Sequence, residues 1–350
     1  MLEKCDYCVF IARLQPPHNA HIKIIKKALK TAKEVIIVFG SHRAAPNIKN
    51  PWSADQRKEM VLRCFEGSDA LRLHFINVRD YYYNDMLWIT EVGQKVREII
   101  GDSYSVKLIG HFKDSSSYYL KLFPQWGFVE TGSLDEGLNA TQIRESYFGE
   151  DLWTPEEHAE FDWRTNIPTQ IVNWLEDFKH TNTYRDLARE YKFITEYKKK
   201  WETAPFPPTF VTTDVVVFKM GQVLLVRRKG NPGKGCLALP GGFINPNEWI
   251  VDSAIRELKE ETKIDIAPKE LKKHISQQQV FDHPNRSLRG RTVTHAFCIK
   301  LPDDGRALPK VKGSDDAEHA RWIPIGDLTL YENEFYEDHM HIINRFLGLY

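Results

Sequence analysis

The first 41 residues carry the pattern that most limits the fold of this chain. A continuous apolar run over residues 7–12 precedes a lysine-rich stretch in which Ile22, Ile25 and Leu29 recur at helical spacing. A second apolar run follows over residues 34–41. A strand, an amphipathic helix and a second strand so close together predict a βαβ unit. Because both strands are continuously apolar, the parallel sheet should be buried on both faces.

The chain is long enough for two domains. It has 350 residues, and residues 181–205 are charged and helix-like before they end among prolines. We therefore predict an N-terminal α/β domain over residues 1–180, a helical and proline-rich linker over 181–205, and a second domain over 206–350. Proline breaks helices and stiffens connectors, which suits a boundary.

Local patterns predict further elements in both halves. In the first half, residues 105–112 read as a strand and residues 159–180 as one helix. In the second half, a turn at Met220-Gly221 should join two strands. The remaining expected elements are helices over 247–263 and 337–348 and strands over 292–301 and 317–325.

Composition argues against several functional classes. The chain has 48 basic and 48 acidic residues, whereas general binders of nucleic acid or membrane surfaces usually carry a basic excess. No apolar run approaches the roughly 20 residues that span a bilayer, and no signal-peptide layout is present. We expect a cytoplasmic protein that binds neither nucleic acid nor membrane.

The five cysteines are scattered and odd in number, so a disulfide scaffold is not expected. Cys5 and Cys8 form a C-x-x-C pair within the first strand. Positions three apart in a strand point to opposite faces, which argues for buried small side chains over a metal or redox site.

Three glutamates in the second half suggest a metal site. Glu257, Glu260 and Glu261 lie three and four apart and should share one helix face. Such carboxylates repel one another unless a cation lies among them, and oxygen ligands suit Mg²⁺ or Mn²⁺ with phosphate substrates. The alternative is a solvated acidic helix face. Arg256 and Glu248 could form an ion pair that fixes this helix.

The spacing around these glutamates resembles the Nudix box. The match runs from Gly242 through Glu248 and residues 256–261 to Ile264, and it departs where the usual glycine is Lys263. Gly241 and Gly242 should permit a tight loop before the helix. The resemblance implies an α/β/α sandwich that hydrolyses nucleoside diphosphates linked to another moiety.

In that family the carboxylates hold divalent metals, so the resemblance implies Glu257, Glu260 and Glu261 as ligands, with Glu257 and Glu261 catalytic. The general base stays open between Glu261 and a later acidic group. That group contains Asp315, Asp316 and Glu318.

An arginine-rich loop bears on the substrate of this half. Arg286, Arg289 and Arg291 suit a diphosphate or a second phosphate. The stretch resembles a loop of ADP-ribose pyrophosphatases, although their usual Asp-Pro is Ser287-Leu288 here. The alternative is a basic exposed loop.

His18 and His21 fall between the first strand and the first helix. A helix N-terminus favours phosphate, and two imidazoles could donate to phosphate oxygens and, when protonated, stabilise developing charge. As a pair alone they could equally be ordinary structural histidines. The stretch resembles the H-x-G-H signature of nucleotidylyltransferases, with Ala20 in place of the glycine.

Residues 138–146 resemble the second motif of the same superfamily. Thr141 and Arg144 match it, and Asn139 replaces the usual serine. Thr141 could cap a helix and contact phosphate. The resemblance implies that Arg144 binds the β- and γ-phosphates of ATP.

Residues 40–61 resemble one branch of this superfamily, the nicotinamide mononucleotide adenylyltransferases. The matching residues are Asn50, Ser53 and Arg57. Ser53 also reads as a helix N-cap. Trp88 is placed where that branch stacks the nicotinamide ring, with core packing as the alternative. Arg13 is a further candidate phosphate ligand.

Taken together, nearly the whole chain resembles nicotinamide mononucleotide adenylyltransferases fused to Nudix hydrolases of the ADP-ribose pyrophosphatase kind. The resemblance implies that ATP and nicotinamide mononucleotide give NAD and pyrophosphate, and that ADP-ribose gives AMP and ribose 5-phosphate. Mg²⁺ or Mn²⁺ is expected in both domains. Two rivals stay open: adenylylation of another phosphate acceptor, and a Nudix domain that senses a ligand without hydrolysing it. Homo-oligomer formation is also left open.

Overall fold

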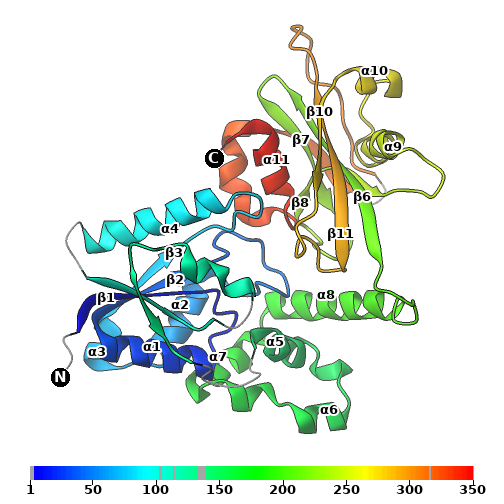
Figure 1. Ribbon diagram of the computed structural model, residues 1–350. Coiled ribbons are helices and arrows are strands. Elements are labelled where there is room, and N and C mark those ends of the chain that lie inside the picture. Colours follow the sequence, from blue (N-terminus) through cyan, green and yellow to red (C-terminus); the bar gives the residue numbers. More distant parts are fainter. Residues whose placement is uncertain (1–3, 102–104, 113–114, 133–138, 315–316, 350) are drawn as a thin grey trace. The chain divides into compact units, whose positions relative to one another are not determined.

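The computed structural model describes residues 4–101, 105–112, 115–132, 139–314 and 317–349 (Figure 1). The chain forms two compact units that divide between Tyr191 and Lys192. No helix in the described part of the chain is long and apolar enough to cross a membrane.

The N-terminal unit contains a five-stranded sheet in the order β3–β2–β1–β4–β5, with every neighbouring pair parallel. The strands are β1 (Cys5–Ala12), β2 (Ala32–Phe39), β3 (Leu73–Asn77), β4 (Val106–Gly110) and β5 (Gly127–Glu130). The prediction of a parallel α/β sheet is confirmed.

Helices cover both faces of this sheet. On one face, apolar residues of α1 (Asn19–Thr31), α2 (Ala54–Leu62) and α3 (Gly67–Leu71) pack with Phe10 of β1. On the other face, α4 (Asp85–Ile100) and the 3-10 segment η1 (Ser115–Lys121) pack with Val9. The strands are apolar at successive positions because the side chains on both faces of the sheet are buried.

Cys5 and Cys8 are free and buried in the same cluster, on the α1 side. The expectation that they face opposite sides is therefore wrong. The backbone N–H groups of Asp6 and Tyr7 both bond to the carbonyl of Ser105 at the start of β1, so the backbone is irregular beside Cys5. Burial raises the pKa of the Cys8 thiol to about 12, so this pair is an apolar core feature.

The segment after the sheet is broken into short helices. They are α5 (Ala140–Phe148), η2 (Glu150–Leu152), α6 (Pro155–Glu160), η3 (Trp163–Asn166) and α7 (Thr169–Phe178). The prediction of one helix over 159–180 is wrong. Asp162 caps η3 through the N–H of Arg164, and Pro168 directly precedes α7. Proline disfavours helical geometry in the residue before it, so the chain stops and restarts there.

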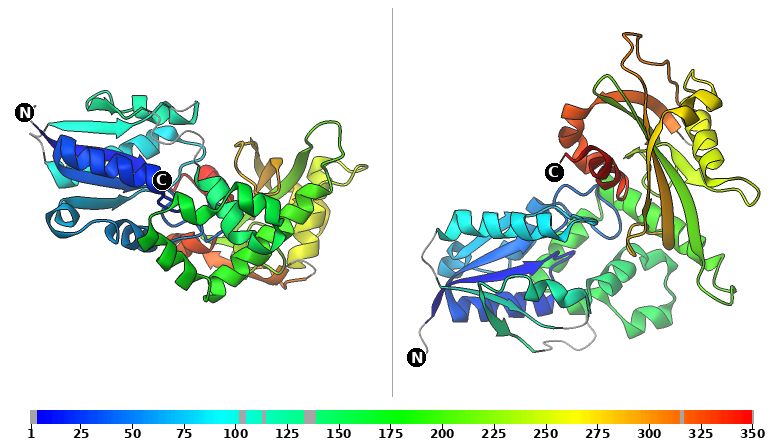
Figure 2. Two further views of the ribbon diagram at one scale, coloured as in Figure 1. Left: turned by 90° about the horizontal axis from the view of Figure 1, so that it is seen from below. Right: turned by 45° about the horizontal axis from the view of Figure 1, so that its top comes forward.

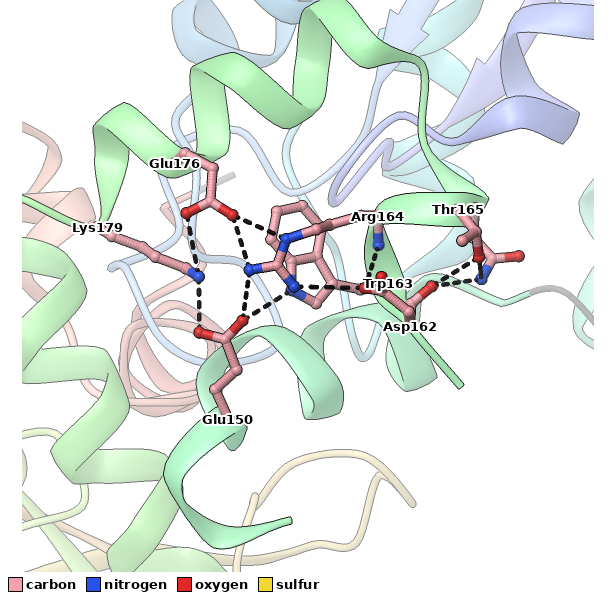
Figure 3. A network of polar contacts seen from close by, with 8 residues as sticks. Glu150, Asp162, Trp163, Arg164, Thr165, Glu176 and Lys179 are labelled. Carbon is pink, nitrogen blue, oxygen red and sulfur yellow. Dashed lines mark hydrogen bonds and ion pairs between the residues drawn. The ribbon is translucent and has the colours of Figure 1, made fainter. Parts of the chain in front are cut away.

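Ion pairs join these short helices (Figure 3). Glu150 accepts from Arg164 at 2.8 Å and from Lys179 at 2.6 Å, while Glu176 contacts the same two cations. The guanidinium of Arg164 also lies over the Trp163 ring, 4.6 Å from its centroid. Although burial opposes the charge of Glu150, the bonds from Lys179 and Arg164 hold its pKa below the ordinary 4.5.

The C-terminal unit is built on a mixed sheet in the order β10–β11–β6–β7–β12, with β8 on β7 and β9 on β6. Only the β11–β6 pair along this order is parallel. The strands are β6 (Thr209–Lys219), β7 (Gln222–Arg228), β8 (Leu237–Ala238), β9 (Gly241–Phe243), β10 (Ile275–Phe281), β11 (Arg291–Lys300) and β12 (Ala317–Pro324). Met220 and Gly221 both take positive φ, as the predicted two-residue hairpin requires.

Helices lie on either side of this second sheet (Figures 1 and 2). The helix α9 (Ile250–Thr262) packs its apolar side on Val215 and Val217 of β6. The helix α11 (His339–Leu347) lies on the opposite side. Two further segments, α10 (Pro268–Lys273) and the 3-10 segment η4 (Ile325–Glu334), complete the sandwich. The boundary between the units falls inside α8 (Asn182–Lys199), within the segment expected to be a linker.

Replacing Glu150 by Gln should destabilise the N-terminal unit at neutral pH. Because the pKa of Glu150 is lowered in the folded state, its stabilisation is present above the unfolded value of about 4.5 and is lost as pH falls below it. We expect a difference of about 1 kcal/mol between wild type and variant at pH 7 that shrinks toward pH 3. Urea unfolding at both pH values measures it, and a difference that stays constant with pH would contradict the assignment.

Candidate active sites

The N-terminal candidate site lies at the carboxyl edge of the parallel sheet. The chain order reverses between β1 and β4, because β1 connects through α1 to β2 on one side while β4 pairs on the other. Ligands of open parallel sheets bind outside the carboxyl ends of strands at such a point. The loop over residues 13–18 leaves β1 there, so it brings Arg13 and His18 to this edge. Arg13 has an exposed side chain.

The two histidines lie against each other at the start of α1. His18 is the N-cap residue, and the two ring centroids are 3.6 Å apart. The Nδ1 atom of His21 accepts the backbone N–H of His18 at 3.3 Å, so the neutral ring carries its proton on Nε2. Ala20 lies in the first turn of α1, whose backbone is helical from Asn19.

Burial and the neighbouring His18 lower the pKa of His21 well below its ordinary value. Of the two roles considered for this residue, the lowered pKa of His21 favours hydrogen-bond donation to phosphate over charge stabilisation by an imidazolium. This ring is a neutral hydrogen-bond donor through Nε2 near pH 7.

We predict that His21 stays neutral as pH is lowered from 8 to about 6, the range in which free histidine begins to titrate. Histidine-selective NMR measures this directly, with the His21→Asn variant assigning the signal. A midpoint near 6.5 for that signal would show an imidazolium and contradict the burial argument.

Arg144 and Thr141 lie together on α5, whose N-cap is Asn139. The Asn139 side chain accepts the N–H of Gln142 at 2.8 Å. The expectation that Thr141 caps the helix is wrong, because the helix already begins at Ala140. Instead, the hydroxyl of Thr141 accepts from Nη2 of Arg144 at 3.2 Å.

Arg144 joins two loops at the edge of the sheet. Its guanidinium donates to the carbonyls of Ile48, at 2.8 Å, and Gln15, at 2.6 Å. Gln15 was not anticipated from the sequence, yet its amide also makes two bonds to the backbone of Trp52. In the sequence, only the position of Gln15 between the first strand and Pro16 could have pointed to this role.

Arg57 fastens the ends of two strands. It is 1% exposed, and its Nη1 donates to the carbonyls of Arg13 and Gly40, which follow β1 and β2. Its guanidinium also lies 4.9 Å from the centroid of the Phe39 ring. This placement favours holding the loop of Arg13 over direct contact with a phosphate.

Burial lowers the pKa of both Arg57 and Arg144 to about 10, and the nearby charge of Arg13 acts in the same direction on each. Both remain charged at neutral pH, and the described carboxylates that act on them, Asp80 and Glu145, offset the cost of burial only in part. An anion bound at this edge would relieve that cost.

Asn50 is 6% exposed, and its backbone N–H donates to the side chain of Asn47. Its own Oδ1 atom has no hydrogen-bond partner among the described residues. A buried carbonyl of this kind suits a ligand that offers a donor. The predicted N-cap Ser53 is confirmed, since it accepts the N–H of Gln56 at 3.2 Å.

Trp88 lies in the first turns of α4. It is half-buried and meets Tyr119 and Phe123 edge-to-face. On this side of its ring, Trp88 therefore packs against other aromatic residues, as the alternative considered from the sequence expected. Stacking on a nicotinamide ring stays a proposal.

The C-terminal candidate site is organised by Arg256 on α9. Its guanidinium contacts Glu248 at 2.6 Å, Glu257 at 2.8 Å and Glu260 at 2.9 Å. The expected pair with Glu248 is confirmed, and the bond holds the pKa of Glu248 down at about 2.

The two glycines before α9 lie in strand β9 and not in a tight loop. Gly241 pairs with Asp214 of β6, and a Cβ atom there would lie 2.1 Å from the carbonyl of Thr213. A Cβ on Gly242 would lie 2.6 Å from a carboxylate oxygen of Glu257. The sequence expectation of a tight loop is wrong. Glycine is needed because β6 lies too close for a Cβ atom on Gly241, and Glu257 of α9 too close for one on Gly242.

Glu261 is the most buried of the three glutamates. It is 9% exposed, and its Oε2 atom accepts the N–H of Gly241 at 3.1 Å. Burial raises its pKa to about 8, helped by the charges of Glu257 and Asp214. Burial also raises the pKa of Glu257.

These carboxylates suit a divalent cation chemically. Among the described residues, no three acidic, imidazole or thiol side chains form a ready group of ligands. Arg256 contacts two of these glutamates, Glu257 and Glu260. Raised carboxylate pKa values mark charge that a cation would compensate. Glu257 and Glu261 therefore fit a metal of the Mg²⁺ or Mn²⁺ kind, and Glu260 stays a proposed third ligand.

Lys263 takes the left-handed conformation that the Nudix glycine would take, with φ 46° and ψ 30° at the end of α9. Its backbone N–H still bonds to the carbonyl of Lys259 at 3.0 Å. The helix thus ends where a glycine would end it, at a steric cost to lysine.

Replacing Lys263 by Gly should raise the free energy of unfolding of the C-terminal unit by about 1 kcal/mol, because glycine takes positive φ without a Cβ clash. Lys263→Ala is the matched control, since alanine also removes the long side chain but keeps the clash. Thermal unfolding without metal compares them. Equal stabilities of the two variants would contradict the backbone explanation.

The three loop arginines differ in their partners. Arg286 is 4% exposed and makes two bonds of 2.9 Å to Asp338. Its role as a phosphate ligand is not supported, because carboxylates occupy the guanidinium. Arg291 contacts Asp282. Arg289 instead lies over the Phe243 ring, 4.8 Å from its centroid.

The candidates for the general base differ in how far they are buried. Glu318 lies on β12 with its side chain 57% exposed, near His319. Asp315 and Asp316 lie outside the described residues. Glu261 is the buried candidate with a raised pKa.

Comparison with known proteins covers both units. A cytidylyltransferase-like domain matches residues 9–111, and a NUDIX domain matches residues 208–346. The nicotinamide/nicotinic acid mononucleotide adenylyltransferase of Acinetobacter baylyi is 42% identical over 189 residues, which are 54% of this chain and 95% of that protein. The ADP-ribose pyrophosphatase of Methanocaldococcus jannaschii is 33% identical over 118 residues, 34% of this chain and 63% of that protein.

Solved structures extend the match to the full length. The bifunctional NMN adenylyltransferase/ADP ribose pyrophosphatase of Francisella tularensis is 35% identical, with a TM-score of 0.90 over 99% of both chains. The chain belongs to this bifunctional family. The same Francisella enzyme complexed with AMP and a manganese ion matches with a TM-score of 0.88, over 98% of this chain and 99% of that one. Membership of the bifunctional family confirms the predicted fold class of both halves.

Proposed function

We propose that the N-terminal unit joins ATP and nicotinamide mononucleotide into NAD and pyrophosphate, and that the C-terminal unit hydrolyses ADP-ribose to AMP and ribose 5-phosphate. The observation that carries this proposal is the match over 99% of the chain to an enzyme named for both activities. The side chains at each site are of the kind that each reaction needs.

In the first reaction, a phosphate oxygen of the mononucleotide attacks the α-phosphorus of ATP. The bond from that phosphorus to the bridging oxygen breaks, and pyrophosphate leaves. No protein nucleophile is required, so positioning and charge stabilisation dominate. His21 donates through Nε2, while His18, Arg144 and Thr141 surround the start of α1 and α5 as contacts for the triphosphate.

Other residues of this unit position the substrates. Arg13 offers an exposed guanidinium at the carboxyl end of β1 and binds phosphate. Asn50 accepts from the mononucleotide through its unpartnered Oδ1. Trp88 stacks on nicotinamide, and Arg57 keeps both loops in place. Mg²⁺ accompanies the triphosphate.

In the second reaction, Glu257, Glu260 and Glu261 hold a divalent cation, which polarises phosphoryl oxygens when bound. The bound cation would lower the raised pKa of Glu261, and the carboxylate so kept ionised suits a group that takes a proton from water near neutral pH. The presence of all three glutamates favours hydrolysis over a domain that only senses a ligand.

Replacing Glu261 by Gln should reduce ADP-ribose hydrolysis by a factor of about 100 or more, because the base and metal ligand is lost. NAD synthesis by the same chain should be unchanged. Both rates are measured on full-length protein, with other phosphate acceptors tested alongside nicotinamide mononucleotide.

The reciprocal control is His18→Ala, which should impair NAD synthesis and leave hydrolysis intact. Loss of both activities in either variant would contradict two independent sites. A wild-type chain that ignores nicotinamide mononucleotide but adenylylates another acceptor would overturn the first assignment.

A further inference from the structure

A cluster of buried polar side chains lies in the C-terminal unit, on the face of the sheet opposite to α9. Asp214 of β6 points to this face, because its neighbour Val215 packs on the α9 side and side chains alternate along a strand. Aspartate and arginine are almost never buried so fully unless they are paired. The members, all buried, are Asp214, Arg286, Thr294, Asp338 and His339, and we call them the Asp214 cluster.

Arg286 contacts both carboxylates of the Asp214 cluster. Its guanidinium makes two bonds of 2.9 Å to Asp338, and its Nη2 atom lies 3.6 Å from Oδ2 of Asp214. The same oxygen of Asp214 accepts the hydroxyl of Thr294 at 2.6 Å. Although burial opposes the charge of Arg286, Asp338 and Asp214 raise its pKa above the ordinary 12.5. The carboxylate of Asp214 is therefore held from two sides, by Arg286 and by β11.

His339 binds the backbone just before β9. Its Nδ1 atom accepts the N–H of Leu239 at 2.9 Å, so the neutral ring carries its proton on Nε2. That Nε2 atom lies 3.9 Å from Oδ1 of Asp214. Burial lowers the pKa of His339 below the ordinary 6.5, despite the charges of Asp214 and Asp338. The ring is therefore a neutral acceptor that ties residue 239 to the cluster.

The Asp214 cluster also reaches the backbone that bonds to Glu261. A Cβ atom on Gly241 would lie 2.7 Å from Oδ1 of Asp214, so this carboxylate lies directly against the Gly241 backbone. The N–H of Gly241 donates to Oε2 of Glu261 at 3.1 Å. His339 thus fixes one end of segment 239–241 and Asp214 the other, and the bond to Glu261 comes from that second end.

We propose that the Asp214 cluster positions the Glu261 carboxylate, acting through segment 239–241 from the opposite face of the sheet. This rests on the proposed hydrolysis of ADP-ribose and assigns the members of the cluster as positioning residues, which touch neither substrate nor metal. Carboxylates that hold a metal are oriented by hydrogen bonds from the surrounding protein, and loss of such support reduces metal affinity and activity. A loosened segment 239–241 should therefore lower kcat and metal affinity more than it raises KM.

The first test removes one bond of the cluster without changing the size of a side chain. Thr294→Val deletes the hydroxyl that bonds to Asp214. Thr292→Val is the matched control, because Thr292 is buried on the same face of β11 but its hydroxyl bonds to the carbonyl of Gly290. On full-length protein, steady-state kinetics with ADP-ribose give kcat and KM, and electron paramagnetic resonance gives the affinity for Mn²⁺.

We expect Thr294→Val to lower kcat and Mn²⁺ affinity about tenfold each, with KM within about twofold of the wild type. In Thr292→Val all three quantities should stay within about twofold. Unchanged kcat and Mn²⁺ affinity in Thr294→Val would overturn the proposal and show that the cluster only attaches α11 to the sheet.

The second test asks whether the acceptor at His339 matters. His339→Ala removes it, whereas His339→Asn presents an amide oxygen where Nδ1 lies and can still accept the N–H of Leu239. We expect the alanine variant to lose about tenfold in kcat and Mn²⁺ affinity, and the asparagine variant to keep about half of each. Circular dichroism checks that both variants are folded. An equal loss in the two variants would contradict positioning through Leu239.

The Mn²⁺ measurement separates this proposal from the proposed function. If the wild type does not hydrolyse ADP-ribose, the proposed function of the C-terminal unit fails. The affinity for Mn²⁺ requires no substrate, so the same variants still test whether the Asp214 cluster positions Glu261. Equal Mn²⁺ affinity in the wild type and in Thr294→Val would then overturn the positioning role as well.

Discussion

Both units are arranged around charged side chains that the fold removes from water. In the N-terminal unit these are guanidiniums: Arg57 and Arg144 are buried against backbone carbonyls, and burial lowers their pKa. In the C-terminal unit they are carboxylates, and burial raises the pKa of Glu257 and Glu261. Each shift is in the direction that an oppositely charged ligand would reverse. A bound phosphate would relieve the first site and a divalent cation the second, as the two proposed reactions require.

Much of the fold could be predicted because it depends on local periodicity. Apolar runs and the spacing of Ile22, Ile25 and Leu29 identified the βαβ unit, and the glutamate spacing identified α9. The errors came where the decisive contact is distant in sequence or depends on a single backbone bond. Pro168 interrupts a helical pattern, and Cys5 packs in the same cluster as Cys8 beside the shared bonds of Asp6 and Tyr7 to Ser105. The spacing of apolar residues does not indicate the break at Pro168 or the position of Cys5.

The candidate sites show the same division. Residue type and spacing identified the charged residues, but not what each charge contacts. Arg286 and Arg289 are three apart in one loop, yet one is bound by Asp338 and the other rests on Phe243. Gly241 and Gly242 were recognised, but their need for close approach depends on Thr213 and Glu257. Those partners lie on other elements, and only the assembled sheet brings them together.

The division inside α8 has a consequence for how the two activities can be inherited. Leu187, in its first half, is buried in the N-terminal unit, while Tyr197, in its second half, packs on Phe210 of the C-terminal unit. Each unit therefore draws core contacts from one continuous helix. Fission of the gene at this point would leave one product with a truncated helix and exposed apolar surface. The continuous helix α8 therefore ties the apolar contacts of both units to one stretch of backbone.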